Sequence, residues 1–113
     1  MTIHHYDLNP HPFDLIKQQK KVYELRLYDK KRRLIAPLDL IEFTNNESQE
    51  TLVVEVVSLH IFNNFQELFA YFPHREFGYE NSDSQHYLDM LDYYPLNRQN
   101  HTQVVAIKIR LIS

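Results

Sequence analysis

Three segments of this chain alternate between apolar and polar residues with a period of two. They span residues 22–28, 51–62 and 104–112, and the second is unusually rich in β-branched residues. This is the period of a β-strand that buries one face. The segments lack the regular alternation of strand and long helix that parallel βαβ units require. The pattern therefore constrains the chain to a sheet that is mostly antiparallel.

The shorter elements follow from local capping signals. Asn9 followed by Pro10 is typical of a helix start, because proline at the first helical position loses no hydrogen bond. Asn64 with Glu67 fits a second helix start with an acidic third position. The elements predicted in this way are strands at residues 3–8 and 40–43, a helix at 10–19, a helix after Asn64, and a helix between Ser82 and Pro95.

The length of 113 residues fits one domain, 1–113. The order of elements predicts an α+β fold, a small mixed β-barrel of five to six mostly antiparallel strands with two to three short helices at its ends. Closing the sheet in this way also protects its edges from pairing with other chains.

Composition narrows the function classes. The chain has no cysteine, which excludes disulfides and thiolate metal sites and fits a cytoplasmic protein. Its apolar runs are shorter than a membrane helix, and no signal peptide is visible, so no membrane association is expected. The seven histidines are scattered without a metal-binding spacing, so neither a metal nor another cofactor is expected.

Charge is distributed unevenly along the chain. Residues 17–33 hold eight of the twelve basic residues and two of the fifteen acidic ones. This asymmetry predicts a cationic face on an acidic body. The run Lys30, Lys31, Arg32 and Arg33 is a candidate for steering phosphate groups, although a charge run of this kind also occurs as a solvated turn.

Glu24 and Arg26 have the same parity in the strand at 22–28, opposite to Tyr23, Leu25 and Leu27. If the latter three face the core, Glu24 and Arg26 face solvent or a cleft. Lys21 has the other parity and joins them only if the turn before the strand redirects it. Spacing alone leaves two interpretations open, a structural ion pair or a tuned site.

The window Gln19–Arg26 resembles the hallmark Gly-x-Lys-x-x-Glu-x-Arg of the ASCH domain family, which has a PUA-like fold. Lys21, Glu24 and Arg26 match, and Gln19 stands where the family has glycine. Further similarity lies in the segments 63–69, 77–79, 89–95 and 104–109. Leu38 and Gln103 also replace glycines that are common in the family.

The resemblance implies a cleft that binds RNA or a nucleotide through Lys21, Glu24, Arg26 and Tyr94. One branch of the family acts as amidohydrolases on modified nucleosides, so the alternative is a small hydrolase, an amidohydrolase or ribonuclease, with Lys21, Glu24 and Glu80 as catalytic candidates. That branch has threonine at the position of Glu24, which argues against hydrolysis. A second alternative is a protein-interaction domain that uses the aromatic loop around Phe77 and Tyr79. The oligomeric state is left open.

Overall fold

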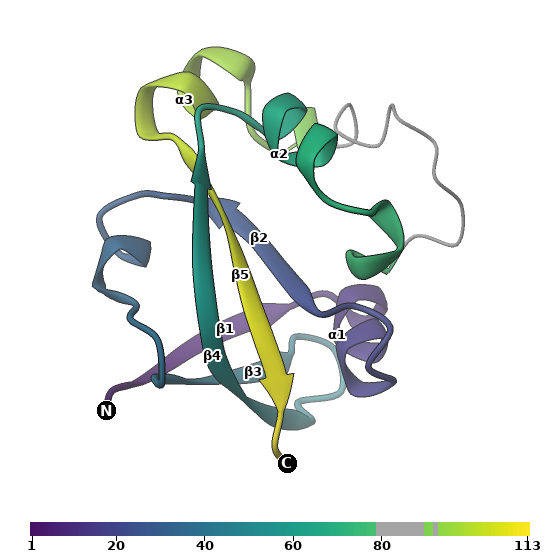
Figure 1. Cartoon of the computed structure of the whole chain (residues 1–113). Helices are drawn as coiled ribbons and strands as arrows, with labels where there is room; N and C mark the ends of the chain where they lie inside the picture. Colours follow the sequence, from purple (N-terminus) through teal and green to yellow (C-terminus); the bar gives the residue numbers. More distant parts are fainter. Residues whose placement is uncertain (79–89, 92) are drawn as a thin grey trace.

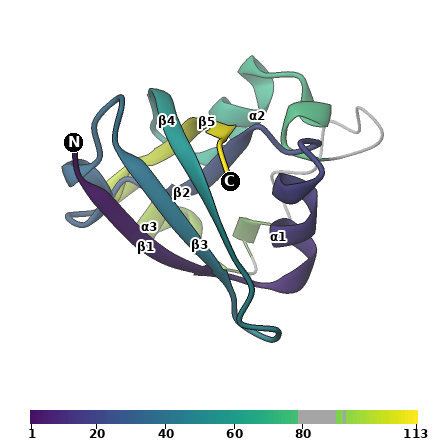
Figure 2. The same cartoon turned by 90° about the horizontal axis from the view of Figure 1, so that it is seen from below.

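The computed structural model describes residues 1–78, 90–91 and 93–113, and its body is a single mixed sheet. The strand order is β1-β3-β4-β5-β2, with β1 parallel to β3 and the other neighbours antiparallel. Figures 1 and 2 show the sheet curling on itself into a half-barrel. The strands are β1 (Ile3–Leu8), β2 (Tyr23–Leu27), β3 (Leu40–Asn45), β4 (Thr51–Phe62) and β5 (Val104–Leu111).

The length of β4 lets one strand serve both halves of the sheet. Residues Thr51–Glu55 pair with β3, and the strand continues along β5 as far as Phe62. The pairing with β5 begins at Val54, and a register shift between Val56 and Ser58 lies within it. Irregularities of this kind bend a strand and increase its twist, which curls the sheet. The α+β class and the mostly antiparallel five-stranded sheet are confirmed.

Within the described residues, three α-helices accompany the sheet: α1 (Pro10–Lys17), α2 (Phe65–Tyr71) and α3 (Leu96–Thr102), with 3₁₀ turns η1 (Arg32–Leu34) and η2 (His74–Glu76). The start of α2 is confirmed, because the Asn64 side chain accepts a hydrogen bond from the Glu67 amide. Asn9 caps α1 by position only and makes no side-chain cap bond. Its side-chain oxygen instead accepts a hydrogen bond from Asn46.

Two helix predictions need correction. The helix predicted for 10–19 ends at Lys17, because Gln19 takes a positive φ of 61°. The sequence predicts that Pro95 ends a helix, but Pro95 directly precedes α3, a helix that the local sequence signals do not predict. Proline fits a helix start as well as a helix end, since its ring disturbs only what precedes it. Most of the helix predicted between Ser82 and Pro95 lies outside the described residues.

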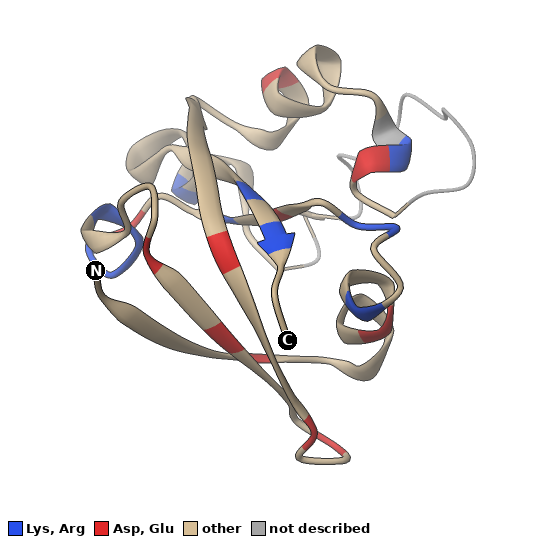
Figure 3. Ribbon diagram, turned by 60° about the horizontal axis from the view of Figure 1, so that its bottom comes forward, with Lys and Arg blue, Asp and Glu red and all other residues tan. Residues whose placement is uncertain are grey.

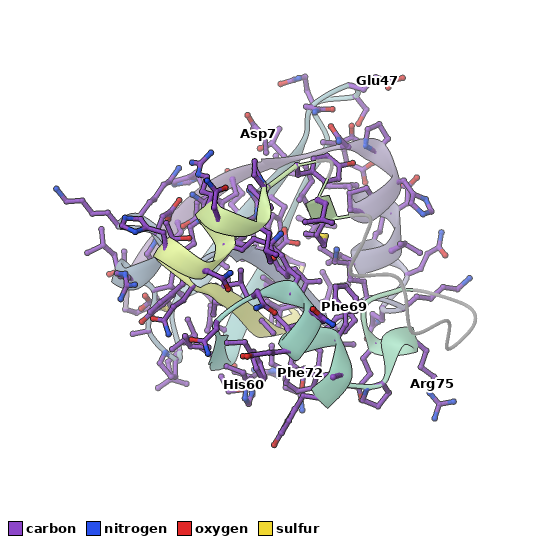
Figure 4. The ribbon with its side chains drawn as sticks, turned by 90° about the horizontal axis from the view of Figure 1, so that it is seen from above. Asp7, Glu47, His60, Phe69, Phe72 and Arg75 are labelled. Atoms are coloured by element: carbon purple, nitrogen blue, oxygen red, sulfur yellow. The ribbon has the colours of Figure 1, made fainter. Side chains whose placement is uncertain are left out.

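The buried side chains form two clusters on opposite faces of β5. The first fills the half-barrel and includes Phe13, Phe43 and Ile107. The second lies under α2 and includes Tyr23, Phe65 and other aromatic residues. Figure 4 shows Phe69, Phe72 and His60 together on the α2 side, and Asp7 of β1 on the opposite side of that view. Tyr23, Leu25 and Leu27 belong to the second cluster, so the predicted core face of β2 is confirmed.

The basic and acidic residues lie in different parts of the fold. Figure 3 shows a basic segment beside the N-terminus, at the turn between β2 and β3, and acidic segments on β3 and β4.

Among the helices of the described residues, none is long and apolar enough to cross a bilayer.

Candidate functional site

A cleft of about 560 Å³ opens where the two edge strands, β1 and β2, approach each other. Its walls come from the end of β1, the first turns of α1, Lys21, β2 and the segments around Gly78 and Tyr94. Lys21, Glu24, Arg26 and Tyr94 all line it. The size is within the range of small-molecule sites.

Glu24 is the centre of an ion-pair network at the floor of this cleft. Its Oε1 atom lies 3.6 Å from Lys21 Nζ and accepts a 3.1 Å hydrogen bond from the Leu25 amide. Its Oε2 atom lies 3.2 Å from an Nη2 of Arg26. The Glu24 side chain is only 4% exposed, against 13% for Lys21 and 17% for Arg26. A buried carboxylate is therefore held between two cations that keep contact with the cleft.

The end of α1 brings Lys21 to this position. The Gln19 amide donates to Ile16 and the Lys20 amide to Leu15, the pair of bonds that defines a Schellman motif. The Lys21 amide also donates to Leu15, and Lys21 forms an isolated antiparallel bridge with Phe77. Lys21 thus lies before β2 rather than in it. The turn overrides the strand parity that separated Lys21 from Glu24 in the sequence.

The charge state of Glu24 follows from its surroundings. Burial by itself raises the pKa of the Glu24 carboxyl, but Lys21, Arg26 and the Leu25 amide oppose it, so the net pKa lies below its usual value. Glu24 is therefore a carboxylate at neutral pH, with both oxygens occupied.

Arg26 connects the network to β1. Its Nη2 atom lies 3.2 Å from the carbonyl oxygen of Asp7 as well as from Glu24. Its guanidinium carbon lies 5.4 Å from the centre of the Tyr6 ring. One side chain of β2 thus contacts two consecutive residues of the opposite edge strand.

The other wall of the cleft is aromatic and apolar. It contains Phe77, Met90, Tyr93 and Tyr94. The Tyr94 ring stacks on Phe65 at 6.0 Å between centroids. Phe77 is 3% exposed and belongs to the second core. The protein-interaction hypothesis relies on an aromatic loop around Phe77 and Tyr79. Phe77 is buried, and Tyr79 lies outside the described residues.

Gln99, which no sequence pattern marks as a site residue, holds this wall in place. It is 1% exposed, accepts a hydrogen bond from the Phe65 amide and donates to the Tyr94 carbonyl. It thereby ties the start of α2 to the Tyr94 segment. A glutamine in a polar helix gives no sequence signal of burial.

The basic turn lies next to Arg26. Lys31 Nζ and the guanidinium carbon of Arg32 are 4.6 and 4.7 Å from the Tyr6 ring centre. Arg32 also pairs with Asp29 at 3.3 Å. Arg33 lies over Tyr28 and donates to the Thr102 carbonyl, whereas Lys30 is exposed. The role of these four residues in phosphate steering stays a prediction.

Comparison with known proteins decides the family. The ASCH domain model matches residues 7–113. The chain belongs to the ASCH domain family. It is similar to the hypothetical protein PH0355, with 30% identity and a TM-score of 0.85, and the match covers 98% of this chain and 100% of that one. It is also similar to protein PF0455 from Pyrococcus furiosus, with 28% identity, 99% coverage of both chains and a TM-score of 0.75.

An ASCH structure from Zymomonas mobilis shares the fold at 18% identity and a TM-score of 0.67, over 96% of this chain and 67% of that one. No curated protein matches the chain.

Three residues at positions where the family resemblance implies glycine share one backbone conformation. Gln19, Leu38 and Gln103 have φ values of 61°, 75° and 67°. All three therefore take the left-handed conformation that favours glycine. None of the three lines the cleft, but Gln19 lies two positions before Lys21, which does, and a left-handed conformation strains a residue that has a Cβ.

Two other sequence predictions concern a third catalytic candidate and a metal site. Glu80, the third catalytic candidate, lies outside the described residues. Within the described ranges, no group of three histidine or acidic side chains could hold a metal ion.

Proposed function

We propose that this ASCH domain binds RNA or a nucleotide in the cleft between β1 and β2. The observation that carries the proposal is the Lys21–Glu24–Arg26 network at the cleft floor. Two cations face one carboxylate, so the network has a net charge of +1 beside open space. Guanidinium and ammonium groups in such a position suit a phosphate.

The opposite wall supports a nucleotide over a simple anion. Tyr93 and Tyr94 line the cleft together with Met90. Aromatic rings bind unpaired bases by stacking, which contributes about 1–3 kcal/mol per base. A cleft with cations on one wall and aromatic rings on the other matches the two chemical halves of a nucleotide.

The hydrolase alternative has less support. A proton-transferring carboxyl works best with a pKa near the operating pH. The lowered pKa of Glu24 and the occupation of both its oxygens keep it ionised and engaged. Glu24 therefore suits the positioning of Lys21 and Arg26 better than proton transfer.

The test is equilibrium binding of nucleoside monophosphates and short single-stranded RNAs at low and moderate salt. Lys21→Met should lower affinity roughly tenfold, which is about 1.4 kcal/mol. Lys20→Met removes the same charge from the neighbouring exposed lysine and should stay within about twofold, since only a weak long-range effect is lost. An absence of saturable binding at low salt, or equal losses in both variants, would contradict the proposal.

A further inference from the structure

Three cationic groups surround one tyrosine ring just outside the cleft. The Tyr6 ring centre lies 4.6 Å from Lys31 Nζ and 4.7 and 5.4 Å from the guanidinium carbons of Arg32 and Arg26. Each separation is within the range of a cation–π contact. Tyr6 is 5% exposed and belongs to the core, so its ring is a fixed platform for these charges.

The charges around Tyr6 are not fully balanced. Arg26 pairs with Glu24 and Arg32 pairs with Asp29. Within the described part of the chain, no carboxylate forms an ion pair with Lys31, which is exposed on the turn. Like charges held close together attract an anion that relieves their repulsion.

Two buried polar atoms beside the Tyr6 ring also lack hydrogen-bond partners. The Tyr6 hydroxyl and Arg32 Nε are buried without a hydrogen-bond partner in the described structure. Burial raises the pKa of Tyr6 despite the charges of Arg32 and Arg26, so the hydroxyl is a donor. Both groups carry N–H or O–H donors, and neither finds an acceptor. Two buried donors beside the Tyr6 ring therefore lack an acceptor in the described structure.

Arg26 belongs to the cleft and to the Tyr6 cluster at the same time. Its Nη2 contacts Glu24 at the cleft floor, and its guanidinium lies over Tyr6. The distances to the ring place the charges of Arg26 and Lys31 within about 10 Å of each other, roughly one Debye length at 0.1 M salt. The two cationic sites are thus continuous across the gap between the edge strands.

We propose that Lys31, with Arg26 and Arg32 around Tyr6, forms a second phosphate subsite next to the cleft. The inference rests on the proposed function. The preferred ligand is then a single-stranded RNA of at least two nucleotides: one nucleotide occupies the cleft, and the phosphate of its neighbour contacts Lys31. A free mononucleotide fills only the first position.

The experiment compares a nucleoside 5′-monophosphate with a 5′-phosphorylated dinucleotide and a hexanucleotide of single-stranded RNA. The wild type should bind both oligonucleotides at least about tenfold more tightly than the monophosphate. Lys31→Met should weaken the binding of both oligonucleotides by about three- to tenfold and reduce the salt slope by about 0.7, as expected for one lost phosphate contact to a single strand. Its affinity for the monophosphate should stay within about twofold.

Two further variants make the result specific. Lys108→Met removes a lysine from the exposed face of β5, outside the cleft, and should leave oligonucleotide affinity within about twofold. Lys31→Arg keeps the charge and should restore tight binding. Thermal unfolding of each variant separates a loss of binding from a loss of folding.

The outcomes distinguish the two proposals. If monophosphates bind and oligonucleotides bind no more tightly, or if Lys31→Met and Lys108→Met are equivalent, the subsite is overturned and the cleft proposal stands. If Lys31→Met lowers the melting temperature without changing affinity, Lys31 serves only to pack on Tyr6, and the subsite is again overturned. If neither ligand binds the wild type, both proposals fail.

Discussion

The side chain of Arg26 on β2 lies 3.2 Å from the carbonyl oxygen of Asp7 on β1, although these strands are the two opposite edges of the sheet. The same Nη2 atom is 3.2 Å from Glu24. A guanidinium therefore bridges the edges of the half-barrel where no backbone ladder joins them in the described structure. This contact joins the two edge strands beside the cleft, which both Asp7 and Arg26 line.

Arg26→Lys should be destabilising although it keeps the charge. An ammonium lacks the planar, weakly hydrated guanidinium that lies over Tyr6 while its Nη2 contacts both Glu24 and Asp7. Loss of charge-assisted hydrogen bonds in a buried network predicts a decrease of about 1–3 kcal/mol in the free energy of unfolding. Urea unfolding of wild type and variant at neutral pH measures this decrease.

The matched control is Arg110→Lys. Arg110 forms an ion pair with Glu55 at 2.7 Å, but its side chain is 64% exposed. Exposed ion pairs contribute about 0–1 kcal/mol, so Arg110→Lys should leave the free energy of unfolding almost unchanged. Equal effects of the two substitutions would mean that the bridge between the edge strands contributes nothing to stability.

Glu24→Gln should change the pH dependence of stability. Burial raises the pKa of Glu24, but Lys21, Arg26 and the Leu25 amide together lower it by more, so its folded pKa is below its unfolded pKa of about 4.3. The stabilisation from the ionised form is fully present above the unfolded pKa and is lost as pH falls through the folded pKa. Glu24→Gln should therefore cost about 3 kcal/mol at pH 7, and this difference should shrink on acidification.

Unfolding free energies from pH 7 to pH 3 test this prediction. Glu42→Gln, which neutralises a carboxylate 37% exposed beside His5, should leave the curve almost unchanged. A wild type and Glu24→Gln pair that differ by the same amount at every pH would show that Glu24 does not titrate with a lowered pKa.

The sequence predicted the sheet because strand periodicity and turn residues are local signals. It placed Glu24 and Arg26 on one face of β2, opposite the core, and the structure has them there. The position of Lys21 could not be derived from strand parity, since the Schellman motif at Gln19 redirects the chain. The family resemblance identified Gln19 as a glycine position, and its positive φ explains the preference.

Residues that act through long-range contacts escaped prediction. Asp39 is 6% exposed and accepts hydrogen bonds from Thr2, His4 and Ala36. The bond from His4 is the main reason that its pKa is lowered. The partners Thr2 and His4 lie more than 30 positions away along the chain. A single sequence contains no signal for such pairs, and the same holds for the burial of Gln99.

Leu38→Gly should stabilise the protein. Leu38 has a φ of 75° in a turn closed by a hydrogen bond from the Asp39 amide to Ala36, and its side chain is exposed. A left-handed conformation costs a residue with a Cβ about 1–2 kcal/mol. The greater freedom of glycine in the unfolded chain offsets roughly 0.4–1 kcal/mol of this gain. We expect a net increase of roughly 0–1.6 kcal/mol in the free energy of unfolding, measured with urea.

Ala36→Gly is the control in the same turn. Ala36 has no positive φ, so glycine there only adds unfolded-state entropy and should destabilise by up to about 1 kcal/mol. If both glycine substitutions destabilise equally, the left-handed turn at Leu38 carries no strain.

Tyr6→Phe should raise stability because it removes a buried hydroxyl without a partner. Leaving such a group unsatisfied costs about 1–3 kcal/mol, while phenylalanine keeps the ring that carries Arg26, Lys31 and Arg32. We expect an increase of about 1 kcal/mol in urea unfolding. Tyr28→Phe is the control, because that ring also lies under an arginine and its hydroxyl is not among the buried unpartnered atoms, so its effect should stay within about 0.5 kcal/mol. A loss of stability in Tyr6→Phe would show instead that its hydroxyl has an acceptor in solution, such as a bound anion or water between it and Arg32.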